Sequence, residues 1–458
     1  MNLTYRVQNP VNNEVIETFE TATDKAIEAT IAAAHEAFGN WRDRDISERA
    51  RIMSKAADLF REKKEELGEI IALEMGKPLD ESIGEVEFSA EIIDYYATHG
   101  PELARDEELN HASPGKAVIR KRPLGPLLGI MPWNYPYYQV ARFAGPNLVL
   151  GNTIILKHAE ICPRSSAAIA ALFAEAGVPK GVYANVYASH DQVSTIIADR
   201  RIQGVSLTGS ERAGAAVAAQ AGKHLKKCVL ELGGNDPYVV LDSTDVAQAA
   251  KDAWAVRIEN TGQACNSNKR IIVMEDIYDQ FVDELVKLAA PLKRGNPMEP
   301  SSDTYSPLSS RAAAERLYEQ VSKAKEAGAT VHVGGEIDDS TAYFSPAVIT
   351  GIPRGSESYY EEFFGPTAVV YKVSSEQEAI ELANDNLFGL GGSVHSEQEG
   401  RAERLALLIE SGMTHANAAS AETADLPFGG IKRSGYGREL GHLAMEEFCN
   451  KQLYYVAG

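Results

Sequence analysis

Cys265 is the residue whose surroundings point most directly to chemistry. It lies in the polar segment Asn-Thr-Gly-Gln-Ala-Cys-Asn-Ser, residues 260–267. A cysteine that serves only as a small buried hydrophobe, the commoner role of this residue type, usually sits in an apolar run. A reactive thiolate needs partial exposure and local hydrogen-bond donors. The segment therefore favours a nucleophile at Cys265.

A single carboxylate, Glu231, ends an apolar run and is followed by Gly233 and Gly234. Burying a carboxylate is costly unless it is paired, so one interpretation is an edge residue that water reaches. The other is a general base whose pKa is raised by burial. The residue types alone do not choose between the two.

Asn134 lies in Met-Pro-Trp-Asn-Tyr-Pro, residues 131–136, directly after a predicted strand. Since Pro136 can begin a helix, Asn134 fits a helix-capping role. It also fits an oxyanion donor, because a side-chain amide can stabilise charge that develops on a carbonyl oxygen.

Two weaker signals suggest a bound nucleotide. Gly209 to Gly214 opens a predicted helix after a strand, so free backbone N–H groups there can bind a phosphate. Lys157 and Glu160, at the end of another predicted strand, can bind sugar hydroxyls. Neither a Walker loop nor a G-x-G-x-x-G motif is present.

The elements that must position these residues follow an α/β pattern. After a hairpin over 5–20 and helices over 23–40, 47–76 and 79–100, strands alternate with helices, which predicts a parallel sheet. Ligands bind beyond the carboxyl ends of such strands. We predict strands at 127–131, 153–157, 204–207 and 229–232, and helices at 136–150, 163–177 and 211–224.

A second alternating region predicts a second α/β domain. Its strands are expected at 238–241, 270–274, 330–333, 367–373 and 391–394, and its helices at 277–290, 309–327 and 375–385. The apolar tail at 452–456 predicts a terminal strand, which needs a partner within the chain or on another subunit.

The composition excludes several classes of partner. The 458 residues include 45 Lys and Arg against 65 Asp and Glu, a net charge of −20, which argues against nucleic acid and anionic membranes as partners.

We find no secretory signal and no apolar run long enough to span a membrane. Four cysteines without a C-x-x-C pair indicate a reducing, cytoplasmic setting. The histidine spacing predicts no metal site.

Taken in order along the chain, these segments resemble the aldehyde dehydrogenase superfamily, and most closely its short bacterial succinate-semialdehyde dehydrogenases. The segments are Pro-Trp-Asn-Tyr-Pro at 132–136, Gly-Asn-Thr at 151–153 leading to Lys157, Thr-Gly-Ser at 208–210, Leu-Glu-Leu-Gly-Gly at 230–234, Gly-Gln-Ala-Cys at 262–265, Glu-Glu-Phe-Phe-Gly-Pro at 361–366, and Pro-Phe-Gly-Gly-Ile-Lys-Arg-Ser-Gly at 427–435.

The resemblance implies an α/β fold with a Rossmann-type cofactor domain, an α/β catalytic domain and a small β oligomerisation flap. We expect the cofactor domain at 1–108 and 128–232, the catalytic domain at 233–417, a segment returning to the cofactor domain at 418–440, and the flap at 109–127 and 441–458. A homodimer or homotetramer is expected.

The resemblance also implies NAD(P)-dependent oxidation of a small aldehyde to a carboxylic acid. In such enzymes a thiol like Cys265 attacks the carbonyl carbon, and Asn134 and the backbone N–H of Cys265 would hold the oxyanion. Hydride transfer to the nicotinamide leaves a thioester, which water activated by Glu231 would hydrolyse. Covalent catalysis of this kind divides one difficult step into two.

The cofactor residues carried over by the resemblance lie in several segments. They are Lys157 and Glu160 for a ribose, Ser210 for the pyrophosphate, Gly209 and Trp133 near the nicotinamide, Glu362 for the nicotinamide ribose, and Phe364 packing beside it. Because the Glu160 carboxylate accepts from ribose hydroxyls but repels a 2′-phosphate, we expect NAD to be preferred, with NADP as the lesser cofactor.

Arg142 resembles the arginine that succinate-semialdehyde dehydrogenases use for the distal carboxylate, although a structural ion pair would also explain it. Many relatives carry a second arginine where this chain has Glu259, and a proline where it has His158. Ser420 or Thr423 would stand in for a substrate-binding serine. Ser267 replaces a second cysteine found in some relatives, so no disulfide is expected beside Cys265.

Three other functions stay open. The first is a broader-range aldehyde dehydrogenase for other small aldehydes. A CoA-acylating enzyme fits less well, because such enzymes often lack a base at the position of Glu231. The third is a nucleotide-binding protein without catalytic activity, which the presence of both Cys265 and Glu231 disfavours.

Overall fold

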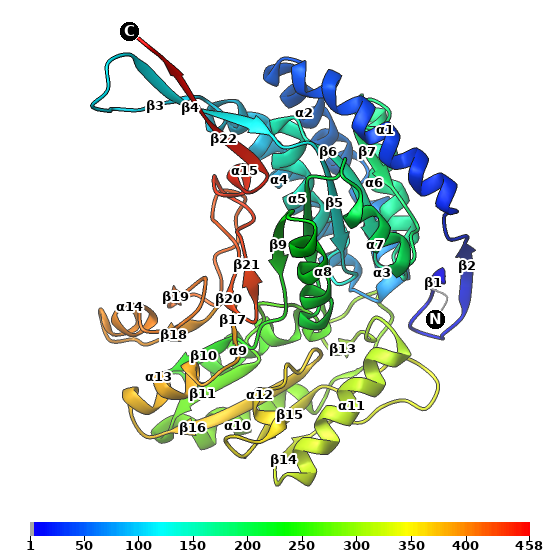
Figure 1. Cartoon of the computed structure of the whole chain (residues 1–458). Coiled ribbons are helices and arrows are strands. Elements are labelled where there is room, and N and C mark those ends of the chain that lie inside the picture. The colour runs from blue at the N-terminus through cyan, green and yellow to red at the C-terminus, as the bar shows by residue number, and fades with distance from the viewer. Residues whose placement is uncertain (1–3) are drawn as a thin grey trace.

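The computed structural model describes residues 4–458, which form two large sheets with helices on both faces and a protruding arm. In Figure 1 the N-terminal helices and the first sheet lie above, and the second sheet lies below. No helix among the described residues is long and apolar enough to cross a membrane.

The first sheet has six strands in the order β21-β9-β8-β5-β6-β7 and is parallel except at β21. Successive residues of its central strand face opposite sides: Leu127 packs in one core and Leu128 in the other. Both faces are therefore buried, as in other parallel sheets. The strands are β5 (Pro126–Met131), β6 (Thr153–His158), β7 (Tyr183–Asn185), β8 (Gly204–Thr208), β9 (Lys227–Glu231) and β21 (Gly435–Tyr436).

Helices cover both faces of this sheet. One core takes residues from α2 to α6, and the other from α1, α7 and α8. The helices are α1 (Asp24–Asp43), α2 (Ile46–Glu62), α3 (Lys64–Met75), α4 (Leu79–Leu103), α5 (Tyr138–Leu150), α6 (Pro163–Ala176), α7 (His190–Ala198) and α8 (Glu211–Lys223).

The single helix predicted over 47–76 is wrong, because the chain breaks at Lys63 into α2 and α3. Phe60 before the break and Leu67 after it enter the same core, so the apolar pattern continues across the bend. Periodicity alone cannot reveal such a bend.

The second sheet has seven strands in the order β14-β15-β16-β11-β10-β18-β19, with only β14 antiparallel. Helices α9 and α10 cover one face, and α11, α13 and α14 the other. Its elements are β10 (Pro237–Val240), α9 (Val246–Ile258), β11 (Arg270–Met274), α10 (Glu275–Ala289), α11 (Arg311–Glu326), β14 (Thr330–Val333), β15 (Ala347–Thr350), α12 (Glu357–Tyr360), β16 (Thr367–Val373), α13 (Glu376–Asn384), β18 (Ser393–His395), α14 (Arg401–Ala406) and β19 (His415–Ala416).

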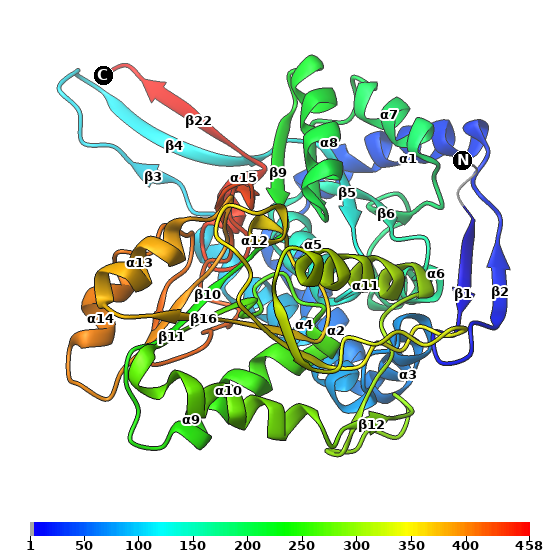
Figure 2. The same ribbon diagram turned by 90° about the horizontal axis from the view of Figure 1, so that it is seen from below.

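The predicted terminal strand exists, and its partner lies within the chain. Strand β22 (Cys449–Val456) pairs antiparallel with β4 (Lys116–Pro123), which also pairs with β3 (Glu107–Glu108). This three-stranded arm projects from the body in two perpendicular views (Figures 1 and 2), and β22 is one of its edges.

The remaining elements are short. The hairpin predicted at the N-terminus is confirmed as an antiparallel pair. These elements are β1 (Tyr5–Gln8), β2 (Val15–Phe19), β12 (Lys293–Arg294), β13 (Thr304–Tyr305), β17 (Phe388–Gly389), β20 (Ile431–Lys432) and α15 (Ala444–Glu447). The predicted domain boundary at 232/233 falls between β9 and β10, which belong to different sheets. The full division of the chain into domains remains a prediction.

Candidate active site

Two cavities meet at Cys265, in the loop between α9 and β11. The sheet-side cavity, about 280 Å³, lies at the carboxyl ends of β5 and β8 against α11, and the helix-side cavity, about 390 Å³, lies against α4 and α5. Both cavities are lined by Cys265 and by Gln139. The thiol is therefore placed between two spaces, each large enough for part of a ligand.

The loop that carries Cys265 has an unusual backbone. Asn260, Thr261 and Gly262 all have positive φ, at 48°, 52° and 74°. A Cβ at Gly262 would lie 2.3 Å from the carbonyl oxygen of Gly365, so only glycine fits there. The carboxylate of Glu81 accepts from the backbone N–H of Asn260 at 2.7 Å. Such a strained turn persists because its surroundings hold it.

The buried guanidinium of Arg257 holds this loop to the start of β16. Its side chain is fully buried, and all five of its N–H groups find acceptors, none of them a carboxylate. The acceptors are the carbonyl oxygens of Gly262 (3.2 Å), Phe363 (2.7 Å), Thr367 (2.8 Å) and Gly365, and Oγ of Ser267 (2.8 Å). Burial lowers the pKa of Arg257 to about 9.

Asn134 lies beside Cys265 in the wall of the sheet-side cavity. Its Nδ2 donates to the carbonyl of Gln263 at 2.9 Å, and its Oδ1 accepts from Nε2 of Gln139 at 2.9 Å. The helix-capping interpretation is wrong, because Oε1 of Glu85 accepts from the backbone N–H groups of Tyr137 and Tyr138 at 2.8 and 3.1 Å.

The Cys265 thiol is protonated at neutral pH in this arrangement. Burial raises the pKa of Cys265 to about 12, although the charges of Arg142 and Lys269 act to lower it. Glu422 and Glu362 raise the pKa further. A reactive thiolate therefore depends on those cations and on a base that accepts the proton.

Glu231 is buried without a hydrogen-bond partner for either carboxylate oxygen. Burial and then the neighbouring Glu439 raise the pKa of Glu231 well above its usual value, against the charge of Arg142. The edge interpretation is wrong, since β21 pairs with β9 at this residue and excludes water. Glu231 lines neither cavity.

Arg142 does not reach the helix-side cavity, which corrects its expected position at the substrate. Its guanidinium is fully buried and forms an ion pair with Glu439. It also donates to the hydroxyl of Tyr138 at 3.2 Å and lies 4.4 Å from the centre of the Phe428 ring. Tyr138, one helical turn earlier, lines the cavity instead.

The helix-side cavity is rich in carboxylates. Glu81, Glu85, Glu259 and Glu422 line it together with one cation, Lys77, which is buried in an ion pair with Glu85. Burial raises the pKa of Glu81 to about 7 and also raises the pKa of Glu422.

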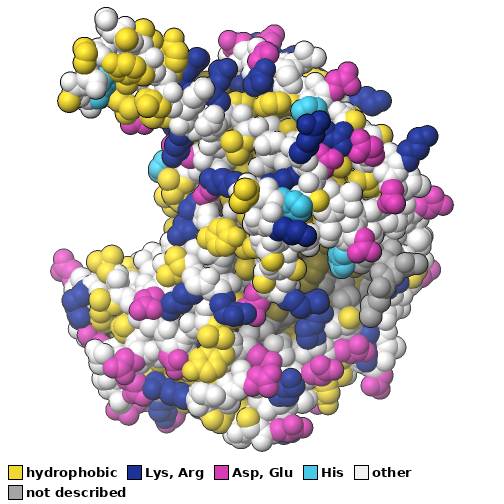
Figure 3. Space-filling view, viewed as in Figure 1, with side chains coloured by type: hydrophobic (Ala, Val, Ile, Leu, Met, Phe, Trp, Pro, Cys, Tyr) yellow, Lys and Arg dark blue, Asp and Glu magenta, His cyan; other side chains and the backbone are white. Residues whose placement is uncertain are grey.

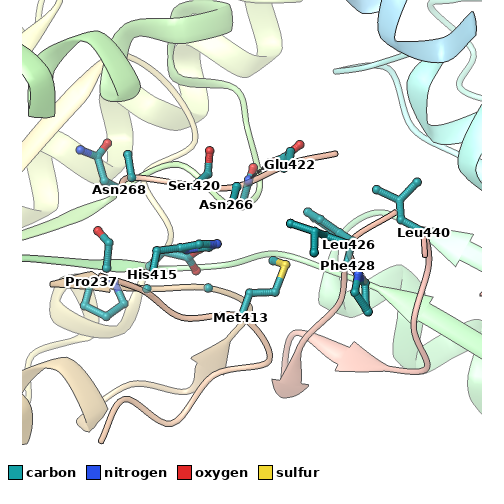
Figure 4. A pocket seen from close by; sticks show the side chains of 17 residues that line it. Pro237, Asn266, Asn268, Met413, His415, Ser420, Glu422, Leu426, Phe428 and Leu440 are labelled. Carbon is teal, nitrogen blue, oxygen red and sulfur yellow. Dashed lines mark hydrogen bonds between the residues drawn. The ribbon is translucent and has the colours of Figure 1, made fainter. Parts of the chain in front are cut away.

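Glu422 approaches Cys265 from a loop far along the chain. Figure 4 shows the Glu422 carboxylate beside the side chain of Asn266, which donates a hydrogen bond to it. Ser420 lines the helix-side cavity. Thr423 does not line it, and its hydroxyl donates to the carboxylate of Asp425 at 2.5 Å. Of the two residues proposed to replace the missing serine, only Ser420 is in place.

Most of the expected cofactor residues line the sheet-side cavity. The rings of Trp133 and Phe364 meet edge to face at 5.8 Å, and Oγ of Ser210 accepts from the N–H of Ala213 at the start of α8. The lining residues from this set are Trp133, Gly209, Ser210, Glu362 and Phe364.

Lys157, near the end of β6, forms an ion pair with Glu160, and neither residue lines the two cavities. Burial would raise the pKa of Glu160, but the charge and hydrogen bond of Lys157 outweigh it and hold the pKa below its usual value. Glu160 is therefore ionised at neutral pH.

Several residues of the site have no sequence signal strong enough to find them. Lys269 is buried, and its Nζ contacts the carbonyl of Cys265 and the carboxylate of Glu362. Arg316 and Gln320 line the sheet-side cavity from α11. Arg316 and Gln320 are spaced i, i+4, which predicts that they share one helix face. The same spacing of polar residues is common on exposed helix faces, so it does not single out a site.

Comparison with known proteins agrees with the resemblance. A sequence model described as the aldehyde dehydrogenase family matches residues 2–453. A succinate-semialdehyde dehydrogenase [NADP(+)] of Deinococcus radiodurans is 48% identical over 97% of this chain and 93% of its own. A succinate semialdehyde dehydrogenase [NAD(P)+] of Escherichia coli K12 is 40% identical over 97% of this chain and 96% of its own.

A solved structure gives the same relationship. The succinic semialdehyde dehydrogenase of Streptococcus pyogenes in complex with NADP+ superposes with a TM-score of 0.95 and is 42% identical, covering 99% of this chain and 100% of that chain.

Arg257 offers a direct test of how the nucleophile loop is held. We expect Arg257→Met to lower the free energy of unfolding by about 3 kcal/mol, because it leaves buried carbonyl oxygens without donors. Urea unfolding measures this loss. Arg404→Met, at an arginine whose side chain is 59% exposed, is the control and should change stability by less than about 0.5 kcal/mol. Equal effects of the two substitutions would contradict the assignment.

Proposed function

The chain belongs to the aldehyde dehydrogenase family and oxidises an aldehyde to a carboxylic acid with NAD(P); on that premise we propose that its aldehyde is succinate semialdehyde. The observation that carries the proposal is the 48% identity to an enzyme named for that substrate, over nearly the whole of both chains. The enzymes from Escherichia coli and Streptococcus pyogenes carry the same substrate in their names.

We assign Cys265 as the nucleophile. Its sulfur attacks the carbonyl carbon and forms a thiohemiacetal, whose oxyanion accepts from the backbone N–H of Cys265 and from Nδ2 of Asn134. An amide nitrogen carries two N–H groups, and the bond to Gln263 uses only one of them. The second N–H is free for the oxyanion, which supports the assignment.

The residues around the sheet-side cavity fit a dinucleotide. The N-terminus of α8 offers N–H groups for phosphate, and the Glu362 carboxylate can accept from ribose hydroxyls. A Cβ at Gly234 would lie 2.4 Å from the carbonyl oxygen of Cys265, so the glycine lets the nucleophile loop pack closely against the segment after β9. When bound in this cavity, NAD(P) would supply the hydride acceptor needed for oxidation of the thiohemiacetal.

Glu231 is the base we propose for thioester hydrolysis. Its raised pKa suits a group that removes a proton from water near neutral pH. The carboxylate now lies beside Glu439, outside both cavities, so hydrolysis requires its side chain to turn toward Cys265.

For the distal carboxylate of the substrate, we assign contact to Tyr138 and an indirect role to Arg142. The Tyr138 hydroxyl accepts from Arg142 and lines the helix-side cavity, and it donates its single O–H to Oε2 of Glu422 at 3.4 Å, so a substrate carboxylate would take the place of Glu422 as acceptor. A hydroxyl polarised by a guanidinium is a stronger donor toward an anion.

A second candidate is oxidation of a wider range of small aldehydes. It is favoured by the carboxyl groups of the cavity, because Glu259 and the partly ionised Glu81 face the space that the distal carboxylate would enter. An uncharged aldehyde such as butanal would avoid that repulsion.

Kinetics of two variants test the reaction. We expect Cys265→Ala to abolish NADH formation, and Glu231→Gln to keep the first turnover while slowing steady-state turnover by about a hundredfold or more. Since the pKa values of Cys265 and Glu231 are both raised, the reactive forms grow with rising pH, and kcat/KM of the wild type should increase between about pH 6 and about pH 9.

The same assay with an aldehyde panel decides the substrate. If succinate semialdehyde is the substrate, its kcat/KM exceeds those of butanal, glycolaldehyde and glutarate semialdehyde. A higher value for butanal would favour the second candidate. NADH formation that persists in Cys265→Ala, or that requires CoA, would contradict the mechanism.

The preference for NAD over NADP remains our proposal. The names of the relatives do not support it, since those from Deinococcus radiodurans and Streptococcus pyogenes refer to NADP. Its support is the ionised carboxylate of Glu160 beside Lys157, which would repel a 2′-phosphate.

Changing Glu160 tests this preference. We expect Glu160→Ser to improve kcat/KM with NADP relative to NAD by about tenfold or more, because the repulsion is lost while Lys157 stays. Glu14→Ser, at an exposed glutamate of the N-terminal hairpin region, is the control and should leave the ratio unchanged. An unchanged ratio of kcat/KM with NADP to kcat/KM with NAD in Glu160→Ser would contradict the proposed preference for NAD.

We propose that the arm joins subunits in a homodimer or homotetramer, in the cytoplasm. Four large apolar side chains of β22 are exposed by 44% to 61%, and Figure 3 shows apolar side chains gathered on the arm. They are Leu453, Tyr454, Tyr455 and Val456. An apolar edge strand needs a partner, and four free cysteines suit a reducing compartment.

Sedimentation measures the assembly. We expect Leu453→Lys combined with Tyr455→Lys to reduce the mass of the particle, because both charges enter the proposed contact. Lys55→Glu, on α2 and outside the arm, should leave the mass unchanged. An unaltered mass in the double variant would argue against the arm as the interface.

A further inference from the structure

Lys269 lies directly behind the nucleophile, at the end of the loop that precedes β11. Its side chain is fully buried, and its Nζ meets three acceptors. These are the carbonyl oxygens of Ala264 at 2.6 Å and Cys265 at 2.7 Å, and Oε1 of Glu362 at 3.0 Å. An ammonium has three N–H groups, so the lysine is fully satisfied and its position is well defined.

The lysine and one backbone N–H together fix the orientation of the Glu362 carboxylate. Oε1 of Glu362 accepts from Lys269 and from the N–H of Gly234 at 3.1 Å. Among the described residues no hydrogen bond is donated to Oε2 of Glu362, which lies in the wall of the sheet-side cavity. One oxygen is thus held by the protein and the other is left for a ligand.

The same ammonium acts on the thiol. Its charge lowers the pKa of Cys265, as does that of Arg142, whereas burial, Glu422 and Glu362 raise it. The carboxylate of Glu362 and a thiolate at Cys265 would repel each other across the cavity. Lys269, whose Nζ contacts Oε1 of Glu362 and the carbonyl oxygen of Cys265, compensates both negative charges.

We propose that Lys269 is a positioning residue that couples the two halves of the site: it orients Glu362 toward the cofactor and stabilises the anionic form of Cys265. This inference rests on the proposed function, in which Glu362 binds the cofactor and Cys265 is the nucleophile. A purely structural role would instead be to balance the buried carboxyl of Asp236, whose pKa its charge also lowers.

Alkylation of Cys265 tests the effect on the thiol without aldehyde or cofactor. The full-length protein is treated with iodoacetamide at a series of pH values, and the Cys265 peptide is followed by mass spectrometry. In Lys269→Met we expect alkylation at pH 8 to be about tenfold slower, the change for one pKa unit, with the profile moved to higher pH. Lys269→Arg should restore most of the rate, and Lys287→Met, at a surface lysine, should not change it.

Cofactor binding tests the effect on Glu362. We expect Lys269→Met to raise the dissociation constant of NAD or NADP about tenfold. In a Glu362→Gln background the same substitution should have no further effect, because the lysine acts through that carboxylate. The proposal would be overturned if the increases in the dissociation constant caused by Lys269→Met and Glu362→Gln multiplied in the double variant. It would also be overturned if the pH dependence of Cys265 alkylation did not move in Lys269→Met.

If Lys269→Met does not fold, Lys269→Gln tests the same effect of the lysine charge on alkylation of Cys265. The amide can still donate to a carbonyl oxygen but carries no charge, so slower alkylation is again expected, and an unchanged rate refutes the proposal. Both measurements omit the aldehyde. A wild type that binds cofactor and alkylates normally, yet does not oxidise succinate semialdehyde, would therefore contradict the proposed function and leave this inference intact.

Discussion

The buried guanidinium of Arg257 is the constraint on which the site depends. Residues 260–262 adopt left-handed backbone angles that cost free energy, so the loop needs partners that are absent from an isolated peptide. Arg257 supplies them by donating to Gly262 and Ser267 on one side and to the residues before β16 on the other. The loop carrying Cys265 and the segment carrying Glu362 and Phe364 are therefore held by one side chain.

Charge compensation governs the rest of the site. Glu231 and Glu439 are both buried and lie close together, and Arg142 lowers the pKa of each. Lys269 forms an ion pair with Glu362, and its charge lowers the pKa of Cys265. Buried charges are tolerated when they are paired. Both cations are committed to carboxylates of the protein, which leaves the helix-side cavity with an excess of negative groups.

Much of the fold could be predicted because buried strands and amphipathic helices have distinct periods. Strand β11 was predicted at its observed bounds, and the alternation around β5, β6 and β8 predicted a parallel sheet that is confirmed. The short strands β7, β15 and β19 were missed, although β14, which is equally short, was predicted at its observed bounds. Helices α7 and α9 were also missed, and the break at Lys63 was hidden because the apolar pattern continues through it.

By itself, the sequence determined the family, through short motifs whose residue types are dictated by backbone approach and chemistry. The Gly-Gly pair at 233–234 and Gly262 are examples, because a side chain there would collide with Glu362, Cys265 or Gly365. Only the tertiary structure decided which charges are free. Arg142 has the right residue type for an anion, but Glu439, about three hundred positions away in the chain, occupies it. Pairing between such distant residues depends on packing, which no local pattern records.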